Sequence, residues 1–398
     1  MVLIQRALYK RFFKPEYYNG TMNVRLIYGI NFLNNLIFFF PVLALYLENE
    51  LFTLTNVALF FSFGAIMQTV LEVPTGIVAD RLGRKHTLIL SQLFFVLDTT
   101  LLVIGGHITV FLASAFFHAI SRSLWSGTMD ALLYDSLKST NEHTLYKKVS
   151  GKSTAIAHMA IALSAVMGGY LAAVSLSLPI ILTLIPVMLG LLLTFFVVEP
   201  RYHKDSDAYT HVKQSFKSFI GNKQIVLIAT GILLIAAVFD SFNALNPVWY
   251  SFKNVPIEMF GWITSILFVL ASVGYHESHR FAQHFGDKHA IMLTTILPPI
   301  TVLSATFFDR YTAIFFVLLS PIFFGLRQPI LDHIVHKQTK SKNRATIMSI
   351  IALMKRLGQA VFVLIMGHLA DLYTINVAYQ AAAILLFIVP IVYSFLDA

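Results

Sequence analysis

Twelve long apolar stretches set the main constraint on what this chain can fold into. A helix needs roughly 20 apolar residues to cross the hydrocarbon layer of a membrane, and stretches of this kind recur along all 398 residues. In the first half we predict spans at 24–47, 55–79, 86–105, 109–136, 151–174 and 178–198. In the second half we predict them at 224–250, 258–280, 289–308, 312–336, 345–370 and 376–395. The expected fold is all-α and polytopic, with twelve transmembrane helices.

The composition agrees with a chain that is surrounded mostly by lipid. Of its residues 57% are hydrophobic and only 12% are charged. Soluble domains carry about a quarter charged residues, because they need polar surface against water. The absence of cysteine excludes disulfides, thiolate metal sites and cysteine nucleophiles. No other catalytic constellation is visible, so we expect no enzyme, no cofactor and no metal.

The positive charges are concentrated on alternate loops. Of the 29 Lys and Arg residues, 23 fall in loops that would share one side of the membrane, whereas the opposite loops hold only Lys253 and Arg310. Because positive residues resist translocation, we place both termini in the cytoplasm and the chain in the inner or plasma membrane. The net charge of +9 therefore indicates membrane topology, and no nucleic-acid partner is expected.

A long polar connector divides the chain near its middle. We interpret residues 199–222 as a cytoplasmic linker between an N-terminal six-helix bundle, 1–198, and a C-terminal six-helix bundle, 223–398. The two halves also share sequence features, which predicts pseudo-symmetric bundles. Arg122 in span 4 and Arg327 in span 10, for example, are about half the chain length apart. Parallel repeats of this kind are typical of transporters that rock about a central site.

The loop between spans 2 and 3 carries the most specific motif. It runs Gly-Ile-Val-Ala-Asp-Arg-Leu-Gly-Arg-Lys over residues 76–85, and a degenerate counterpart follows span 8 at 279–289. The first copy resembles the G-x-x-x-D-R-x-G-R-K motif of the major facilitator superfamily. The resemblance extends over the whole chain through span number, central linker and repeat. It implies a rocker-switch carrier in which spans 1, 4, 7 and 10 line the cavity.

Within that superfamily the chain is most similar to the proton-coupled drug-efflux antiporters. Their span 5 pattern, G-x-x-x-G-P-x-x-G-G, is matched here at Gly168 and Gly169, while its proline is replaced. Small residues allow helices to approach closely. The resemblance therefore implies a role for this glycine pair in packing between the two bundles.

The motif loop is expected to act as a cytoplasmic gate. The resemblance implies that its acid pairs across to span 3 and to a second acid at the foot of span 4, where Asp135 lies. The residues assigned to the gate are Gly76, Asp80, Arg81, Gly83, Arg84, Lys85 and Asp135. Alternatively, the positive residues only set the membrane topology.

Acids and bases inside spans are the candidates for proton coupling. Charges in the hydrocarbon are costly and usually face the bundle interior. Asp240 lies near or beyond the middle of span 7, and Arg122 in span 4 has Glu72 and Asp98 as possible anionic partners. The coupling candidates are thus Asp240, Glu72, Asp98 and Arg122. The alternative is static ion pairing, for example of Asp240 with Arg327.

The substrate cavity is expected among polar and aromatic residues of the same spans. These are Asn31, Asn35 and Phe38 in span 1, Arg122, Asn243, Asn246 and Arg327. For the span 1 amides, hydrogen bonding between helices is an equal alternative. Trp249 and Tyr250 are interpreted as interface anchors or, less favoured, as stacking partners of a substrate. Lys355 and Arg356 in span 11 either face an anionic substrate or the seam between the halves, or extend to the cytoplasm.

The leading function is a secondary active transporter that moves a small organic compound by alternating access. A proton-coupled antiporter that exports a drug-like or amphipathic substrate is favoured. The alternatives are a proton symporter or facilitator that imports a metabolite such as a sugar or organic anion, or a non-transporting sensor or lipid flippase. The expected partners are the substrate, protons and the lipid bilayer, and the protein is expected to be a monomer.

Overall fold

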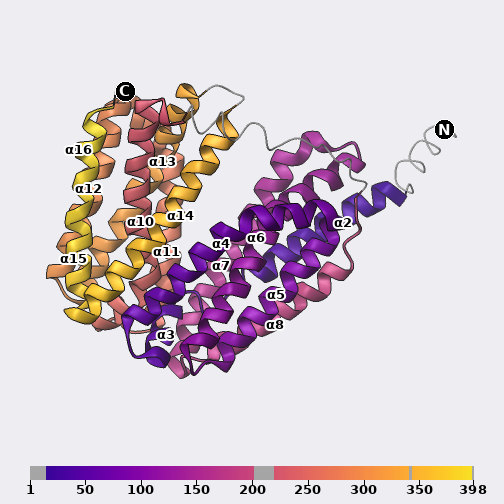
Figure 1. Ribbon diagram of the computed structural model, residues 1–398, viewed down its shortest axis with the longest axis horizontal. Coiled ribbons are helices and arrows are strands. Elements are labelled where there is room, and N and C mark those ends of the chain that lie inside the picture. Colours follow the sequence, from indigo (N-terminus) through magenta and orange to yellow (C-terminus); the bar gives the residue numbers. More distant parts are fainter. Residues whose placement is uncertain (1–14, 201–218, 340–342, 397–398) are drawn as a thin grey trace. The chain divides into compact units, whose positions relative to one another are not determined.

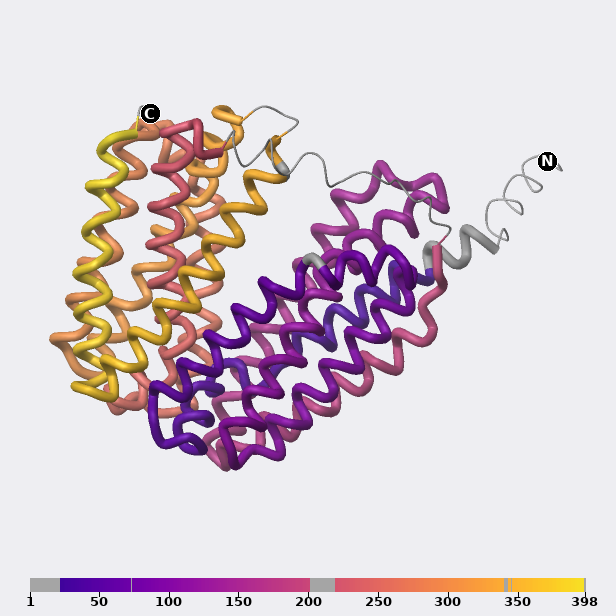
Figure 2. Tube along the Cα trace, viewed as in Figure 1, coloured from indigo at the N-terminus to yellow at the C-terminus, as the bar shows by residue number. Residues whose placement is uncertain are grey.

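A computed structural model describes residues 15–200, 219–339 and 343–396 (Figures 1 and 2). Most of the expected linker at 199–222 and the first 14 residues lie outside this part of the chain. The described residues form α-helices and one short 3-10 turn, with no strand among them. The expected all-α class is therefore confirmed.

The helices follow the apolar stretches closely. In the first half they are α2 (Pro15–Asn34), α3 (Leu43–Leu51), α4 (Leu54–Leu82), α5 (Arg84–Ile104), α6 (Ile108–Ser139), η1 (His143–Leu145), α7 (Tyr146–Val174) and α8 (Leu178–Phe195). In the second half they are α10 (Lys223–Phe252), α11 (Glu258–Phe285), α12 (Asp287–Phe307), α13 (Arg310–Gln338), α14 (Arg344–Leu372), α15 (Ile375–Leu386) and α16 (Ile388–Ser394). Eleven candidate spans among the described residues are long and apolar enough to cross a membrane.

The first expected span, 24–47, is an interrupted helix. It consists of α2 and α3, separated by turns. Pro41 lacks a backbone N–H and disfavours helical geometry at the residue before it, which favours an interruption in this segment. Thr183 of α8 accepts a hydrogen bond from the backbone N–H of Phe38 at 3.1 Å. This interrupted segment is not among the eleven candidate spans of the described residues, so a twelfth membrane crossing here stays a prediction.

The described contacts group the chain into two compact units. Unit 1 comprises residues 1–40 and 70–205, and unit 2 comprises 41–69 and 206–398. Residues 41–69 belong to the first half by chain order but to unit 2 by contact, and α4 contains residues of both units. Pro74 of α4 has no N–H for the carbonyl of Val70, the first residue of α4 that belongs to unit 1. The expected bundle boundaries at 198 and 223 stay a prediction.

In unit 1, a buried asparagine joins three segments. The Asn23 amide nitrogen donates to Ser136 Oγ at 3.0 Å and to the Val198 carbonyl at 2.8 Å. Its Oδ1 accepts from the Val198 backbone N–H at 2.9 Å. An apolar cluster that includes Ile27 and Leu132 packs beside these bonds. Helix α2 is thus fixed to α6 and to the segment that follows α8.

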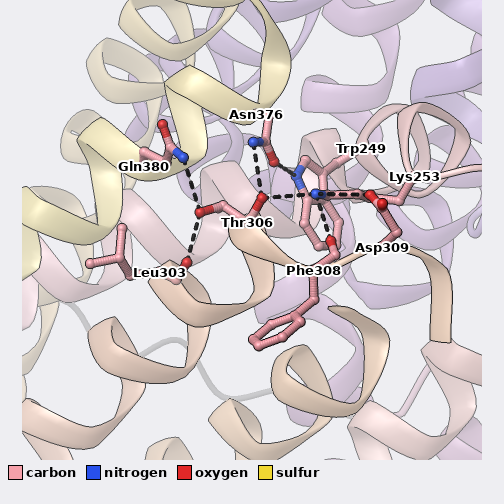
Figure 3. Close-up of polar contacts among 8 residues, drawn as sticks. All are labelled: Trp249, Lys253, Leu303, Thr306, Phe308, Asp309, Asn376 and Gln380. Atoms are coloured by element: carbon pink, nitrogen blue, oxygen red, sulfur yellow. Dashed lines mark hydrogen bonds and ion pairs between the residues drawn. The ribbon is translucent and has the colours of Figure 1, made fainter. Parts of the chain in front are cut away.

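In unit 2, a buried lysine lies at the end of α12 (Figure 3). Lys253 Nζ donates to the carbonyls of Thr306 at 2.9 Å and Phe308 at 2.8 Å. The lysine side chain is 5% exposed, and its ion pair with the 98% exposed Asp309 is long, at 3.9 Å. Burial lowers the pKa of the Lys253 ammonium, and Asp309 partly opposes this shift. A cation at this position stabilises carbonyls that have no partner within the helix.

The aromatic residues beside Lys253 are part of the core of unit 2. Trp249 and Tyr250 are 0% and 1% exposed. The Trp249 ring stacks on Tyr379 with 5.2 Å between centroids, and its Nε1 donates to Asn376 Oδ1 at 3.2 Å (Figure 3). The interpretation of Trp249 and Tyr250 as membrane-interface anchors, or as partners of a substrate, is therefore wrong. Both rings lie inside the unit because the neighbouring helices cover this end of α10.

The first turn of α4 is capped by a carboxylate from the far end of the chain. Asp371 of α14 accepts from the backbone N–H groups of Leu54 at 2.8 Å and Thr55 at 2.7 Å, and from Thr55 Oγ1 at 2.5 Å. The helices approach closely one turn before it. A Cβ atom at Gly367 would lie 2.6 Å from the carbonyl oxygen of Leu54. A glycine is therefore required for this cap to form.

Replacement of Asp371 by alanine is expected to destabilise unit 2. The change removes the acceptor of two N–H groups at the start of α4, and loss of a helix N-cap costs about 1 kcal/mol. Thermal unfolding of the purified protein in detergent measures the effect. Asp309→Ala, at a 98% exposed side chain, is the control and should unfold close to the wild type. Equal melting temperatures for the two variants would contradict the capping role.

Candidate functional site

The motif loop joins α4 to α5 through a glycine in a backbone conformation that other residues avoid. Gly83 has φ 84° and ψ 168°, a region populated almost only by glycine. The space beside it is occupied by Glu199, whose Oε1 would lie 2.8 Å from a Cβ atom at this position. The two Glu199 oxygens accept from the backbone N–H groups of Arg84 and Lys85, each at 2.7 Å. Glu199 thus caps the N-terminus of α5.

Glu199 was missed in the sequence, where it falls at the start of the linker. The chain offers no local signal for this contact, since 115 residues separate Glu199 from Arg84. Lys85 strengthens the same junction, because its Nζ donates to the Phe195 carbonyl at 2.9 Å.

Arg84 lies between the two acids that the sequence analysis singled out for the gate. Its Nη1 is 3.6 Å from Asp80 Oδ1, and its Nε is 3.8 Å from Asp135 Oδ2. These distances are longer than those of a charge-assisted hydrogen bond. Of the other gate residues, Arg81 and Gly76 are exposed. The structure therefore brings Asp80, Arg84 and Asp135 together as a loose charge cluster.

The Asp98 carboxylate is bound by Ser114 and His118, and not by Arg122, which the sequence analysis considered. The side chain is 1% exposed. Oδ1 accepts from Ser114 Oγ at 2.6 Å, and Oδ2 lies 2.7 Å from His118 Nδ1. Both contacts come from α6, so they favour the structural alternative for this carboxylate. Two other coupling candidates, Glu72 and Arg122, have exposed side chains.

The amides of the first span make hydrogen bonds within unit 1. Asn31 Nδ2 donates to Ser153 Oγ of α7 at 2.7 Å, and Asn35 Nδ2 donates to the Asn31 carbonyl at 2.7 Å. The next asparagine, Asn34, accepts from Gln92 at 2.8 Å in a buried contact that the sequence did not indicate. These bonds favour the packing alternative for the amides. Phe38 is half-buried, and Gly168 and Gly169 are buried in α7.

The three polar candidates of α10, Asp240, Asn243 and Asn246, lie in different environments. Asp240 is half-buried and interacts electrostatically with Lys355 of α14. Asn243 is exposed. Asn246 is buried, and its Oδ1 accepts from the Tyr379 hydroxyl at 3.0 Å. Of these three residues, Asp240 therefore remains the strongest candidate for proton coupling.

Arg327 is 2% exposed and compensates for a proline in the neighbouring helix. Its Nη1 donates to the Thr294 carbonyl of α12 at 2.6 Å. That carbonyl would normally accept from residue 298, which is Pro298 and has no N–H. Arg327 also lines a small pocket of unit 2, together with Gln328 and Lys355. Arg327 thus satisfies a backbone carbonyl of α12 and also contributes to the wall of a pocket.

These features define a class of protein, a helical membrane protein with charged residues inside its spans. The chain belongs to the Major Facilitator Superfamily, whose profile matches residues 26–274 and 244–398. It is accordingly a multi-pass membrane transporter.

Relatives of known sequence and structure agree with this assignment. The MFS-type transporter YxaM of Bacillus subtilis (strain 168) is 20% identical over 367 residues, which cover 89% of this chain and 91% of that protein. Multidrug resistance protein 1 of the same strain is 27% identical over 279 residues, 69% of this chain and 70% of that protein. The solved structure of the nucleoside transporter NupG has a TM-score of 0.80 at 14% identity, and the match covers 94% of this chain and 98% of NupG. At this low identity the likeness to NupG shows the fold alone.

Gly83→Ala is expected to lower the free energy of unfolding by about 1–3 kcal/mol, the usual cost of a residue forced into such a backbone region. The added methyl group would also displace Glu199 from the N-terminus of α5. Thermal unfolding in detergent measures the loss. Gly76→Ala is the matched control from the same motif, because nothing lies within 4 Å of its Cβ position. The account of Gly83 fails if both variants unfold at the wild-type temperature.

Proposed function

We propose that this protein is a proton-coupled antiporter that exports a small amphipathic organic compound by alternating access. The observation that carries the proposal is Asp240, a half-buried carboxylate in an apolar span whose electrostatic partner is Lys355. The relationship to a multidrug resistance protein supports an exporter of this type.

Asp240 has the chemistry required for coupling. A carboxylate in a membrane helix is costly while it is ionised and unpaired, by about 2.5–3.5 kcal/mol on insertion scales. It is stabilised either by a nearby cation or by protonation. A substrate with a cationic or strongly polar group would compete with the proton for Asp240. Exclusive binding of one or the other is the requirement for antiport.

The motif loop is proposed as the gate on the cytoplasmic side. Arg84 lies 3.6 Å and 3.8 Å from two acids on different helices, so each contact is weak and can be exchanged. Contacts of this strength suit a switch between two arrangements of packed helices. In this proposal Gly83 and Glu199 hold the loop geometry, while Asp80, Arg84 and Asp135 exchange partners. Gly76, Arg81 and Lys85 complete the loop.

A second candidate is a proton symporter for an organic anion. It is favoured by the pocket of unit 2, whose lining includes two positively charged side chains, Arg327 and Lys355. An anion that takes the place of Asp240 as the partner of Lys355 would leave Asp240 to be protonated. Anion and proton would then move in the same direction.

Asp240→Asn is expected to abolish coupled flux and to spare exchange. In proteoliposomes with an imposed pH gradient, the wild type should accumulate a cationic dye, and the variant should not, because the amide cannot take up or release a proton. Counterflow of the same dye without a gradient should persist in the variant. Asp309→Asn, an exposed acid of the same unit, should leave both activities unchanged. Equal loss of gradient-driven flux and counterflow would assign Asp240 a structural role instead.

A further inference from the structure

A small pocket in unit 2 contains two cations of different helices. It is bounded by α10, α13 and α14, and its polar lining consists of Arg327, Gln328 and Lys355. The rest of the lining is apolar, with Phe324 and aliphatic side chains of α10 and α13. The lining mixes apolar side chains with a few polar groups, as in sites for small organic molecules. Its free space is sufficient only for a small group, so it can serve as one part of a larger site.

The two cations lie at the same depth along their helices. Arg327 is eleven residues before the end of α13 at Gln338, and Lys355 is eleven residues after the start of α14 at Arg344. Because these two helix ends are joined by a short connection, both side chains start about 16 Å from it. They therefore face the pocket from two sides at one level, well inside the spans.

The charge of Arg327 is not compensated by an acid. Among the described residues no carboxylate oxygen lies within 4 Å of its guanidinium, and its one hydrogen bond within the chain goes to the Thr294 carbonyl. A guanidinium has five N–H donors, so most of them are available for a further partner. A 98% buried cation with this many free donors is costly inside a membrane unless an anion joins it.

The nearby acids are each held by another group. Asp240 lies one helical turn beyond Ala236 of the pocket wall and interacts with Lys355. Asp332 lies one turn beyond Gln328 and accepts from its amide nitrogen at 2.9 Å. The charged residues that line the pocket are therefore cations. The two acids lie one helical turn away from the lining, Asp240 on α10 and Asp332 on α13.

We propose that this pocket is a subsite for an oxyanion, in which Arg327 and Lys355 bind the carboxylate or sulfonate group of an amphipathic substrate. The apolar wall would then contact the hydrophobic body of the same molecule. The planar guanidinium of Arg327 matches two oxygens of such a group, and Lys355 adds a point charge. The inference rests on the proposed transport function and adds the chemical class of the substrate. A zwitterionic compound would also place its cationic group beside Asp240, consistent with antiport.

The test compares benzoate with benzamide, which has the same size but no charge. Binding is measured by calorimetry on the full-length protein in phosphatidylcholine nanodiscs, so that no anionic lipid competes. The wild type should bind benzoate at least about tenfold more tightly than benzamide, as expected for one charge-assisted contact. Equal binding of the two compounds would overturn the proposal.

Three variants assign the effect to the pocket. Lys355→Gln should weaken benzoate binding about tenfold or more and leave benzamide unchanged. Arg327→Lys keeps one donor for Thr294 but loses the planar fork, and should also weaken benzoate binding. Asp240→Asn should strengthen it, because the competing carboxylate is removed from Lys355. Lys337→Gln, at an exposed residue of α13 outside the pocket lining, is the control. A loss of benzoate binding in this control as large as that in Lys355→Gln would overturn the assignment.

The outcome can be separated from that of the proposed function. If benzoate does not bind while wild-type vesicles still accumulate the dye, the oxyanion subsite is wrong and the antiporter stands. If benzoate binds with the expected variant pattern and no dye accumulates, the subsite stands and the antiporter is wrong.

Discussion

The hydrocarbon layer offers no partner for a backbone N–H or carbonyl, so every such group must be satisfied within the protein. Much of the structure follows from how this chain meets that requirement where its helices are interrupted. Arg327 bonds the Thr294 carbonyl that Pro298 leaves without a donor. Thr183 accepts from Phe38 where the first span breaks before Pro41. Lys253 bonds two carbonyls at the end of α12. Several polar side chains inside this protein therefore serve to satisfy backbone groups where a helix is interrupted or ends.

This requirement also explains which sequence predictions held. Span positions depend on length and apolarity, which are local properties. The helices begin and end within five residues of the expected bounds, apart from the interrupted first span and the last span, which is divided into α15 and α16. The break before Pro41 could not be located from hydropathy, because the segment is apolar on both sides of it. Trp249 and Tyr250 were misassigned for a related reason. Their position near a span end predicts an anchor, but burial depends on neighbours distant in sequence.

Contacts between distant residues account for most of what the sequence did not indicate. Glu199 and Asp371 both cap helices that lie far from them along the chain. The family resemblance implied that Asp80 would pair with Asp135, and in the structure Arg84 lies near both acids. The motif could not predict Glu199, which lies outside it. The repeat shows the same limit. Gly286 shares the positive φ of Gly83, at 75° against 84°, but no atom occupies the space beside it. The second loop thus repeats the backbone conformation of the first, but not its contact with a carboxylate.

The way α4 is divided between the units has a mechanical consequence. Its first turns are fastened by Asp371 in unit 2, and its last residue adjoins the Gly83 loop in unit 1. One helix of 29 residues, roughly 43 Å long, therefore runs from one unit into the other. Pro74 has no N–H to donate to the Val70 carbonyl, and Val70 is where α4 passes from unit 2 into unit 1. Helix α4 is therefore expected to bend most easily at the boundary between the two units.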